Sequence, residues 1–243
     1  MTTFKKAFKD VYKETLSEEG FRYNSKYGFY MKLVNEELLE YITYIPSWTP
    51  IKGNKCFKIF AGIVSLYCDS VDKGSLRMHG VEFFFYSNDI KDKSGIVYNE
   101  GNMLDGIQVS LNKTKKYIIP AFHEVTDLDS YIQFRKKTGG IDAISSAKSF
   151  WADSLALIMA DNHDDFQDVF QRAIFELKKE METVGIGGTY EKNYDLLYQG
   201  IIKEIAGSRD EIYKDAELYK KAIEEAERRK QANLELLREA KVI

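Results

Sequence analysis

The chain has 243 residues, of which 44% are hydrophobic and 30% are charged, so it can bury a core and differs from a disordered tail. Its 35 basic and 38 acidic residues leave a net charge of −3, without the basic excess that is typical of nucleic-acid binders. A total of three histidines argues against sites built from several histidine side chains.

The N-terminal segment predicts a helix over residues 2–17. Apolar side chains recur at intervals of three and four residues, with lysine and glutamate on the opposite face. The members of this apolar stripe are Phe4, Phe8, Val11, Tyr12 and Leu16. Gly20 follows directly, and a glycine just past the last turn commonly ends a helix.

The pattern then changes to a period of two residues, which indicates strands. Runs at 27–34, 38–46, 57–68 and 81–86 predict four strands, the first two joined by a short hairpin at 35–37. Residues 87–106 are polar and predict a long loop, and 107–111 predict a short fifth strand. A helix followed by such a meander is an α+β layer, with helices covering the sheet.

The remainder of the chain predicts helices. Thr126 and Asp127 signal a helix start, and residues 138–140 form the expected boundary between an α+β domain at 1–140 and an all-α region at 141–243. A capping box of Ser208 and Glu211 begins a long last helix. Lys230 and Asn233 occupy its core positions, where a stable coiled coil has apolar residues. We favour packing of this helix on its own chain, with projection of its second half or a helical dimer contact as the alternative.

Cys56 and Cys68 flank the strand predicted at 57–68, which would hold them too far apart for a disulfide. Two reduced thiols favour a cytosolic protein. The first residues lack the apolar run of a signal peptide, and the longest internal apolar stretch, 59–67, is far too short to span a membrane. We therefore expect a cytoplasmic protein that does not enter membranes.

Aromatic residues are concentrated near the N-terminus, where the first 90 residues hold 18 of the 33 in the chain. We favour the interpretation that most of them fill the core between sheet and helices. The alternative is that some of the polar-tipped rings line a groove for a peptide, a sugar or a base. The candidate binding residues are Tyr27, Tyr30, Tyr41, Tyr44 and Trp48.

An acidic cluster offers a candidate metal site. Carboxylates and an imidazole this close together can hold a divalent ion. The competing interpretation is helix capping, because aspartate and asparagine accept hydrogen bonds from the free N–H groups of a first turn. The candidate ligands are Asp161, His163, Asp165 and Asp168, and no organic cofactor is predicted.

Three segments resemble the bacterial domain-of-unknown-function family 4304: Leu16-Ser-Glu-Glu-Gly20-Phe21, then Phe29-Tyr30, then Phe57-Lys-Ile-Phe-Ala-Gly62-Ile63. The resemblance covers roughly residues 1–140. It implies a small α+β fold in which a first helix ends in Gly-Phe before a strand meander. The family has no established activity, so the resemblance assigns no catalytic residue.

The leading functional prediction is a non-enzymatic protein-interaction or regulatory module in the cytoplasm. Its expected partners are another protein, or a second copy held through the C-terminal helix. The first alternative is a metal-assisted hydrolase that uses the cluster at 161–168. The second is single-stranded nucleic-acid binding by aromatic stacking together with the first 60 residues, which hold ten basic and seven acidic side chains. Residues 141–202, with five basic and eleven acidic side chains, argue against nucleic acid.

Overall fold

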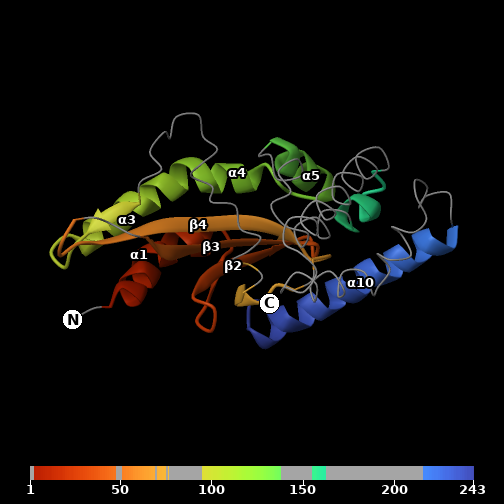
Figure 1. Ribbon diagram of the computed structural model, residues 1–243, viewed down its shortest axis with the longest axis horizontal. Helices are drawn as coiled ribbons and strands as arrows, with labels where there is room; N and C mark the ends of the chain where they lie inside the picture. The colour runs from red at the N-terminus through yellow and green to blue at the C-terminus, as the bar shows by residue number, and fades with distance from the viewer. Residues whose placement is uncertain are drawn as a thin grey trace, which may run out of the picture. The chain divides into compact units, whose positions relative to one another are not determined.

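The computed structural model describes residues 3–47, 51–68, 70–74, 76, 95–137, 155–162 and 216–243, and it confirms a mixed α+β fold (Figure 1). The predicted strand at 81–86 and the helices predicted between residues 163 and 215 lie outside this part. The elements run in the order α1 (Phe4–Glu18), β1 (Arg22–Asn24), β2 (Phe29–Val34), β3 (Leu38–Ser47), β4 (Lys55–Ser65), β5 (Ile96–Tyr98), α3 (Met103–Lys113), η2 (Thr114–Ile118), α4 (Ile119–His123), α5 (Leu128–Lys137) and α10 (Ala216–Glu239).

The chain divides into two compact units. The first unit comprises Met1–Val64, Val71–Tyr131 and Leu234–Ile243, and the second comprises Ser65–Ser70 and Ile132–Asn233. The boundary predicted at 138–140 lies outside the described residues. The first unit contains nearly the whole sheet together with α1, α3, η2 and α4.

Helix α1 forms where the apolar stripe predicted it. Thr3 caps its first turn, with its hydroxyl oxygen accepting from the backbone N–H of Lys6 at 3.4 Å. At the other end Gly20 has φ +84°, and Phe21 N–H donates to the carbonyl of Leu16 at 2.8 Å. This left-handed glycine and the long backward hydrogen bond end the helix, as the sequence indicates.

Among the described residues the sheet has five strands in the order β1-β2-β3-β4-β5, and the strand pairs with a described register are antiparallel. The predicted hairpin joins β2 to β3, where Asn35 and Glu36 both have positive φ angles of 50° and 56°. That backbone matches the twist of a two-stranded ribbon. Strand β1 is a three-residue addition at the sheet edge that the sequence pattern does not predict.

Aromatic side chains are buried on both faces of the sheet. On one face Phe4 of α1 lies 4.8 Å from Phe57 of β4 and 4.7 Å from Tyr44 of β3, measured between ring centroids. On the opposite face the ring of Tyr41 lies 5.9 Å from that of Phe29 and 6.1 Å from that of Phe60. The apolar surface of this sheet is therefore used in packing on each side.

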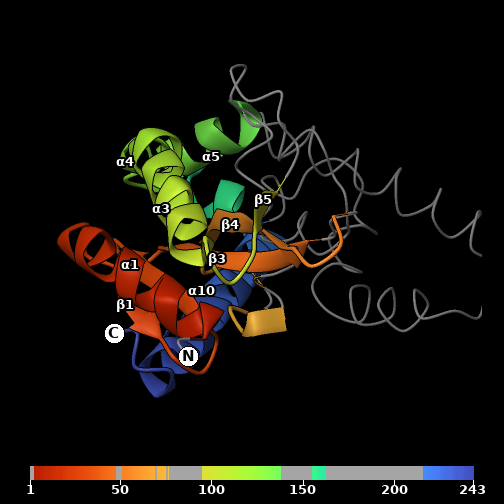
Figure 2. The ribbon, with the colours of Figure 1, turned by 90° about the vertical axis from the view of Figure 1, so that its left-hand side faces the viewer.

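The segment after the sheet differs from the prediction. Residues 103–113 form helix α3, so the fifth strand expected at 107–111 is wrong, and Ile96–Tyr98 forms a strand inside the expected loop. A five-residue π-helical segment, η2, continues α3 into α4. Figure 2 shows α1 and α3 side by side on one face of the sheet. The Tyr12 hydroxyl joins them, at 2.8 Å from the Ser110 hydroxyl and 3.1 Å from that of Thr114.

Helix α5 begins at the predicted signal. Ser130 N–H donates to the Asp127 side chain at 2.9 Å, while the Ser130 hydroxyl oxygen accepts from the backbone N–H groups of Thr126 and Asp127. These bonds satisfy donors that the first turn leaves free. They also hold the pKa of the Asp127 carboxyl below its usual range, chiefly through the backbone bond from Ser130.

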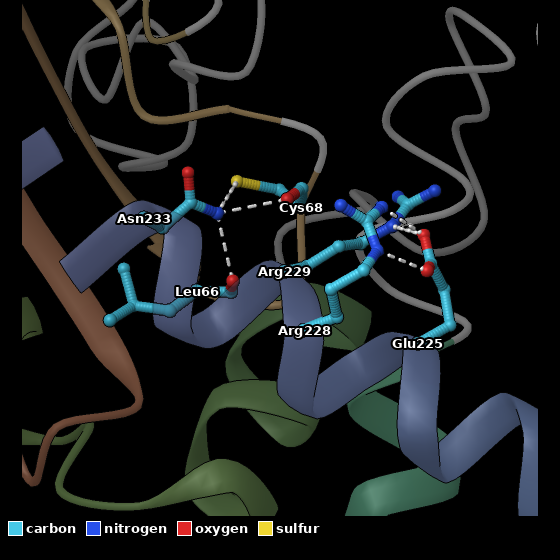
Figure 3. Close-up of polar contacts among 6 residues, drawn as sticks. All are labelled: Leu66, Cys68, Glu225, Arg228, Arg229 and Asn233. Atoms are coloured by element: carbon cyan, nitrogen blue, oxygen red, sulfur yellow. Dashed lines mark hydrogen bonds and ion pairs between the residues drawn. The ribbon is translucent and has the colours of Figure 1, made fainter. Parts of the chain in front are cut away.

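The second half of α10 packs on its own chain, as the favoured interpretation of the sequence has it, and does not project. Asn233, Leu234 and Leu237 are all buried. The Asn233 amide donates to the carbonyl oxygens of Leu66 and Cys68, each at 2.9 Å (Figure 3). A polar residue at a core position is therefore satisfied by backbone acceptors rather than left for a partner.

Cys56 and Cys68 are buried free thiols, which confirms that they do not pair. Among the helices of the described residues, none combines the length and the apolar character that crossing a bilayer requires.

Candidate functional site

The tyrosines proposed as a binding face are largely packed against protein. Tyr27, Tyr30 and Tyr41 are buried. The Tyr30 hydroxyl donates to the carbonyl of Lys9, and the Tyr41 hydroxyl donates to that of Leu76 at 2.9 Å. Tyr44 is half-buried against Phe4 and Phe8, and Trp48 lies outside the described residues. This burial agrees with the favoured core-packing interpretation for the three buried rings.

Of the four proposed metal ligands, the structure describes Asp161; His163, Asp165 and Asp168 lie outside the described residues. Asp161 follows a helical segment at 155–159 and has φ +55°. Asn162 N–H donates to the carbonyl of Leu157, and Asp161 N–H to that of Ile158. Asp161 thus occupies the left-handed position that ends a helix, rather than an N-cap. Within the described ranges there is no group of three or more metal-ligating side chains.

Apart from Lys6, the exposed charges of helix α1 lie in two rows of like sign. Lys5, Lys9 and Lys13 recur every four residues along one flank, and all three are exposed. Residues at this spacing are neighbours on a helix surface. A second row, formed by Asp10, Glu14 and Glu18, runs along the other flank. We call the first set the lysine row and the second the acidic row.

The lysine row is not neutralised within the described part of the chain. Its ammonium groups form no ion pair with the described residues. Lys5 donates instead to the backbone carbonyl of Ser25 at 3.4 Å, and the Lys9 ammonium lies 5.1 Å from the centroid of the Tyr23 ring. These contacts hold two of the three side chains against the β1–β2 hairpin while leaving their charge available.

Helix α10 shows what a helix with internally paired charges looks like in this protein. Lys221 pairs with Glu217 at 3.7 Å and Lys220 with Glu224 at 3.8 Å. Glu225 binds Arg229 at 2.8 Å and Arg228 at 2.6 Å (Figure 3). The two arginines together hold the pKa of the Glu225 carboxyl below its usual range, against the effect of its partial burial.

The like-charge rows of α1 and the charges at its two ends are unfavourable for the stability of the helix. Like charges four residues apart destabilise a helix by about 0.2–0.5 kcal/mol per pair. Lysines also occupy the first turn and Glu18 the last turn, the reverse of what the helix dipole favours. Packing holds the helix in place, because Phe8, Tyr12 and Leu16 are fully buried. A surface that departs from local preferences in this way is a candidate for function.

The sequence predictions missed this surface, although its signal is readable. The spacing of four between Lys5, Lys9 and Lys13 is visible without a structure. What the structure adds is that no described carboxylate pairs with these lysines and that their flank borders the β1–β2 hairpin.

Comparisons with known proteins add no relative: no family model, no curated protein and no solved structure matches the chain. The resemblance to family 4304 therefore stays a prediction.

Proposed function

We propose that the protein is a non-enzymatic interaction module that binds an acidic polypeptide along the lysine row of α1. The observation that carries this proposal is the unpaired row of Lys5, Lys9 and Lys13 on a helix that gains no stability from it.

The spacing of the row suits a helical partner. Four residues at 1.5 Å rise place successive ammonium groups about 6 Å apart, so the row extends about 12 Å. Glutamates four residues apart on a partner helix have the same spacing. Each exposed ion pair contributes about 0.2–1 kcal/mol, so such binding is weak, depends on salt and chiefly steers encounter.

One feature favours a protein partner over single-stranded nucleic acid. The buried rings of Tyr30 and Tyr41 are not open to stacking bases.

The remaining predictions have less support. Self-association through α10 has less support because charges in its first half, at Lys220, Lys221 and Glu225, are already paired within the helix. A metal-assisted hydrolase rests on four residues of which Asp161 alone is described. A cytoplasmic location, which we also propose, agrees with two buried free thiols.

The test uses the full-length protein and a fluorescent helical peptide with glutamates spaced by four, measured by anisotropy at low salt. We expect the triple variant Lys5→Gln, Lys9→Gln, Lys13→Gln to weaken binding by about tenfold, equivalent to about 1.4 kcal/mol. The matched control replaces the exposed lysines Lys52, Lys55 and Lys115 with glutamine, which removes the same charge elsewhere.

An equal loss in both triple variants would show that net charge, and not the row, attracts the peptide. Tighter binding of a single-stranded oligonucleotide than of the peptide would replace the protein partner by nucleic acid. A glutamine version of the peptide should not bind either protein.

A further inference from the structure

A buried ion pair joins two strands on the face of the sheet that α1 covers. Lys32 of β2 and Glu40 of β3 are directly opposite in the antiparallel register. The Lys32 ammonium lies 3.2 Å from Oε2 of Glu40. Glu40 is 1% exposed, whereas the Lys32 side chain keeps 28% of its surface in solvent. The carboxylate is therefore much more costly to hold charged than its partner.

The Glu40 carboxylate is incompletely satisfied. Although Lys32 approaches Oε2, this oxygen has no hydrogen-bond partner of acceptable geometry. An ion pair without the accompanying hydrogen bonds recovers little of the desolvation cost of a buried charge. The neutral acid is consequently favoured at this position, and burial raises the pKa of the Glu40 carboxyl to about 7.

A second pair lies near this carboxyl and ties two helices together. Glu19, the residue that follows α1, places its Oε2 2.7 Å from Nε2 of His123, the last residue of α4. His123 and Glu19 act on Glu40 with opposite sign, because a positive imidazolium favours the ionised carboxylate and a second carboxylate disfavours it. Lys32, Glu19 and His123 are the charged groups of β2, of the α1 end and of α4 that act on Glu40.

We propose that Glu40, Lys32, Glu19 and His123 form a proton-responsive latch that holds the C-terminal end of α1 and the end of α4 over the sheet. With Glu40 protonated, the buried site is neutral and Lys32 turns to solvent for its hydration. When Glu40 loses its proton, the site holds an ion pair with an unsatisfied oxygen, and the native packing around it is weakened.

The latch responds close to neutral pH because the groups around Glu40 set the pKa of its carboxyl. Burial shifts the carboxyl toward the neutral form, and the opposing charges of Lys32 and His123 limit that shift. The latch is separate from the lysine row, since Lys5, Lys9 and Lys13 belong to neither of its pairs. Its existence therefore does not depend on the proposed function.

The direct test is a carbon-13 NMR titration of the glutamate carboxyl groups in the full-length protein, with Glu40→Gln used to assign the resonance. We expect the Glu40 carboxyl to titrate at a pKa of about 7. A value in the ordinary range of glutamate would overturn the proposal.

Exposed partners provide variants that keep the core intact. Glu19→Gln removes a group that raises the pKa of Glu40 and should lower that pKa, while His123→Ala removes a group that lowers it and should raise it. The matched control is Glu18→Gln, an exposed neighbour that does not act on Glu40 and should leave its titration unchanged. Equal titration curves in the Glu19, His123 and Glu18 variants would refute the coupling, even if Glu40→Gln failed to fold.

Amide hydrogen exchange supplies the conformational readout. After correction for intrinsic exchange, amides of the last turn of α1 and of α4 should open more readily above the Glu40 transition than below it. Glu40→Gln should abolish that difference. Unchanged protection across the transition would show that the carboxyl titrates without moving the latch.

Discussion

The side-chain amide nitrogen of Asn233 lies 2.9 Å from the backbone carbonyl oxygen of Leu66, and both residues are buried. The same nitrogen donates to the carbonyl of Cys68, so one amide group on α10 binds the backbone at Leu66 and Cys68, directly after β4 (Figure 3). A residue that weakens an apolar helix seam thus fixes where the helix packs, by hydrogen bonds that no apolar residue could make.

Replacing Asn233 should therefore destabilise the protein in a graded way. Asn233→Ala removes both hydrogen bonds and should lower the free energy of unfolding by about 1–3 kcal/mol. Asn233→Asp should cost more at neutral pH, because a buried carboxylate would face two carbonyl oxygens. Urea denaturation measures both, and an aspartate variant as stable as the alanine variant would contradict the proposed donor role.

Tyr12 links α1 to α3 through a directional chain of hydroxyl groups. Ser110 donates its proton to the carbonyl of Ile107 at 2.6 Å, so Tyr12 must donate to Ser110 and Thr114 must donate to Tyr12. Tyr12→Phe keeps the ring but leaves the buried Thr114 hydroxyl without this acceptor. We expect a loss of about 1–3 kcal/mol in chemical denaturation.

The control for this change is Tyr23→Phe, which removes the hydroxyl of a half-buried ring that forms no hydrogen bond with the described residues. It should alter stability by less than about 0.5 kcal/mol. Equal losses in the two variants would mean that the hydroxyl chain contributes nothing specific.

Gly20 ends α1 in a left-handed conformation with φ +84°. A Cβ atom there would meet Lys32 Cδ at 3.7 Å, an ordinary contact, so the cost of Gly20→Ala comes from the backbone angle. We expect Gly20→Ala to lose about 1 kcal/mol of stability and Gly20→Asn to lose less, since asparagine tolerates this region better. Thermal unfolding with calorimetry distinguishes them, and a reversed order would refute the conformational explanation.

Glu40 should make the stability of the protein depend on pH with a definite sign. Its pKa in the folded protein, about 7, exceeds its ordinary value of 4.5. Between these values the folded state holds a proton that the unfolded state has lost, so the free energy of unfolding falls as the pH rises through this window. The full shift corresponds to on the order of 3 kcal/mol.

Glu40→Gln should remove this decline, so that its stability relative to the unmodified protein improves from about pH 5 to about pH 8. Urea denaturation across that range measures the difference, with Glu18→Gln as the exposed control. Parallel pH profiles of the Glu40 variant and the unmodified protein would show that this carboxyl is not the source.

The elements that the sequence predicts correctly are those specified by neighbouring residues. The repeat of Phe4, Phe8, Tyr12 and Leu16 forms an apolar stripe on any helix, and Gly20 ends it through its own backbone freedom. The hairpin at Asn35 and Glu36 follows from the short polar interval between two strand-like runs. Such features need no information about distant parts of the chain.

The segment 107–111 shows where local pattern is insufficient. Ile107, Val109 and Leu111 alternate with polar residues as in a strand, yet Ile107 and Leu111 also share one face of a helix. Helix α3 buries Ile107 and Leu111 and leaves Val109 47% exposed. Ser110 shares this buried helical face, and its hydroxyl meets that of Tyr12, 98 residues earlier in the sequence.

The sequence by itself determined the α+β class, the first helix and the β2–β3 hairpin. The repeat of apolar residues and the turn residues specify these elements through neighbours only a few positions apart. Tertiary structure alone decided the rest: that tyrosines are buried on both faces, that Asn233 finds two carbonyl acceptors, and that Glu40 is buried opposite Lys32. Each depends on strands and helices brought together from distant parts of the chain. Burial and hydrogen-bond pairing then set the free-energy cost of burying a polar group, and neighbours in sequence specify neither of them.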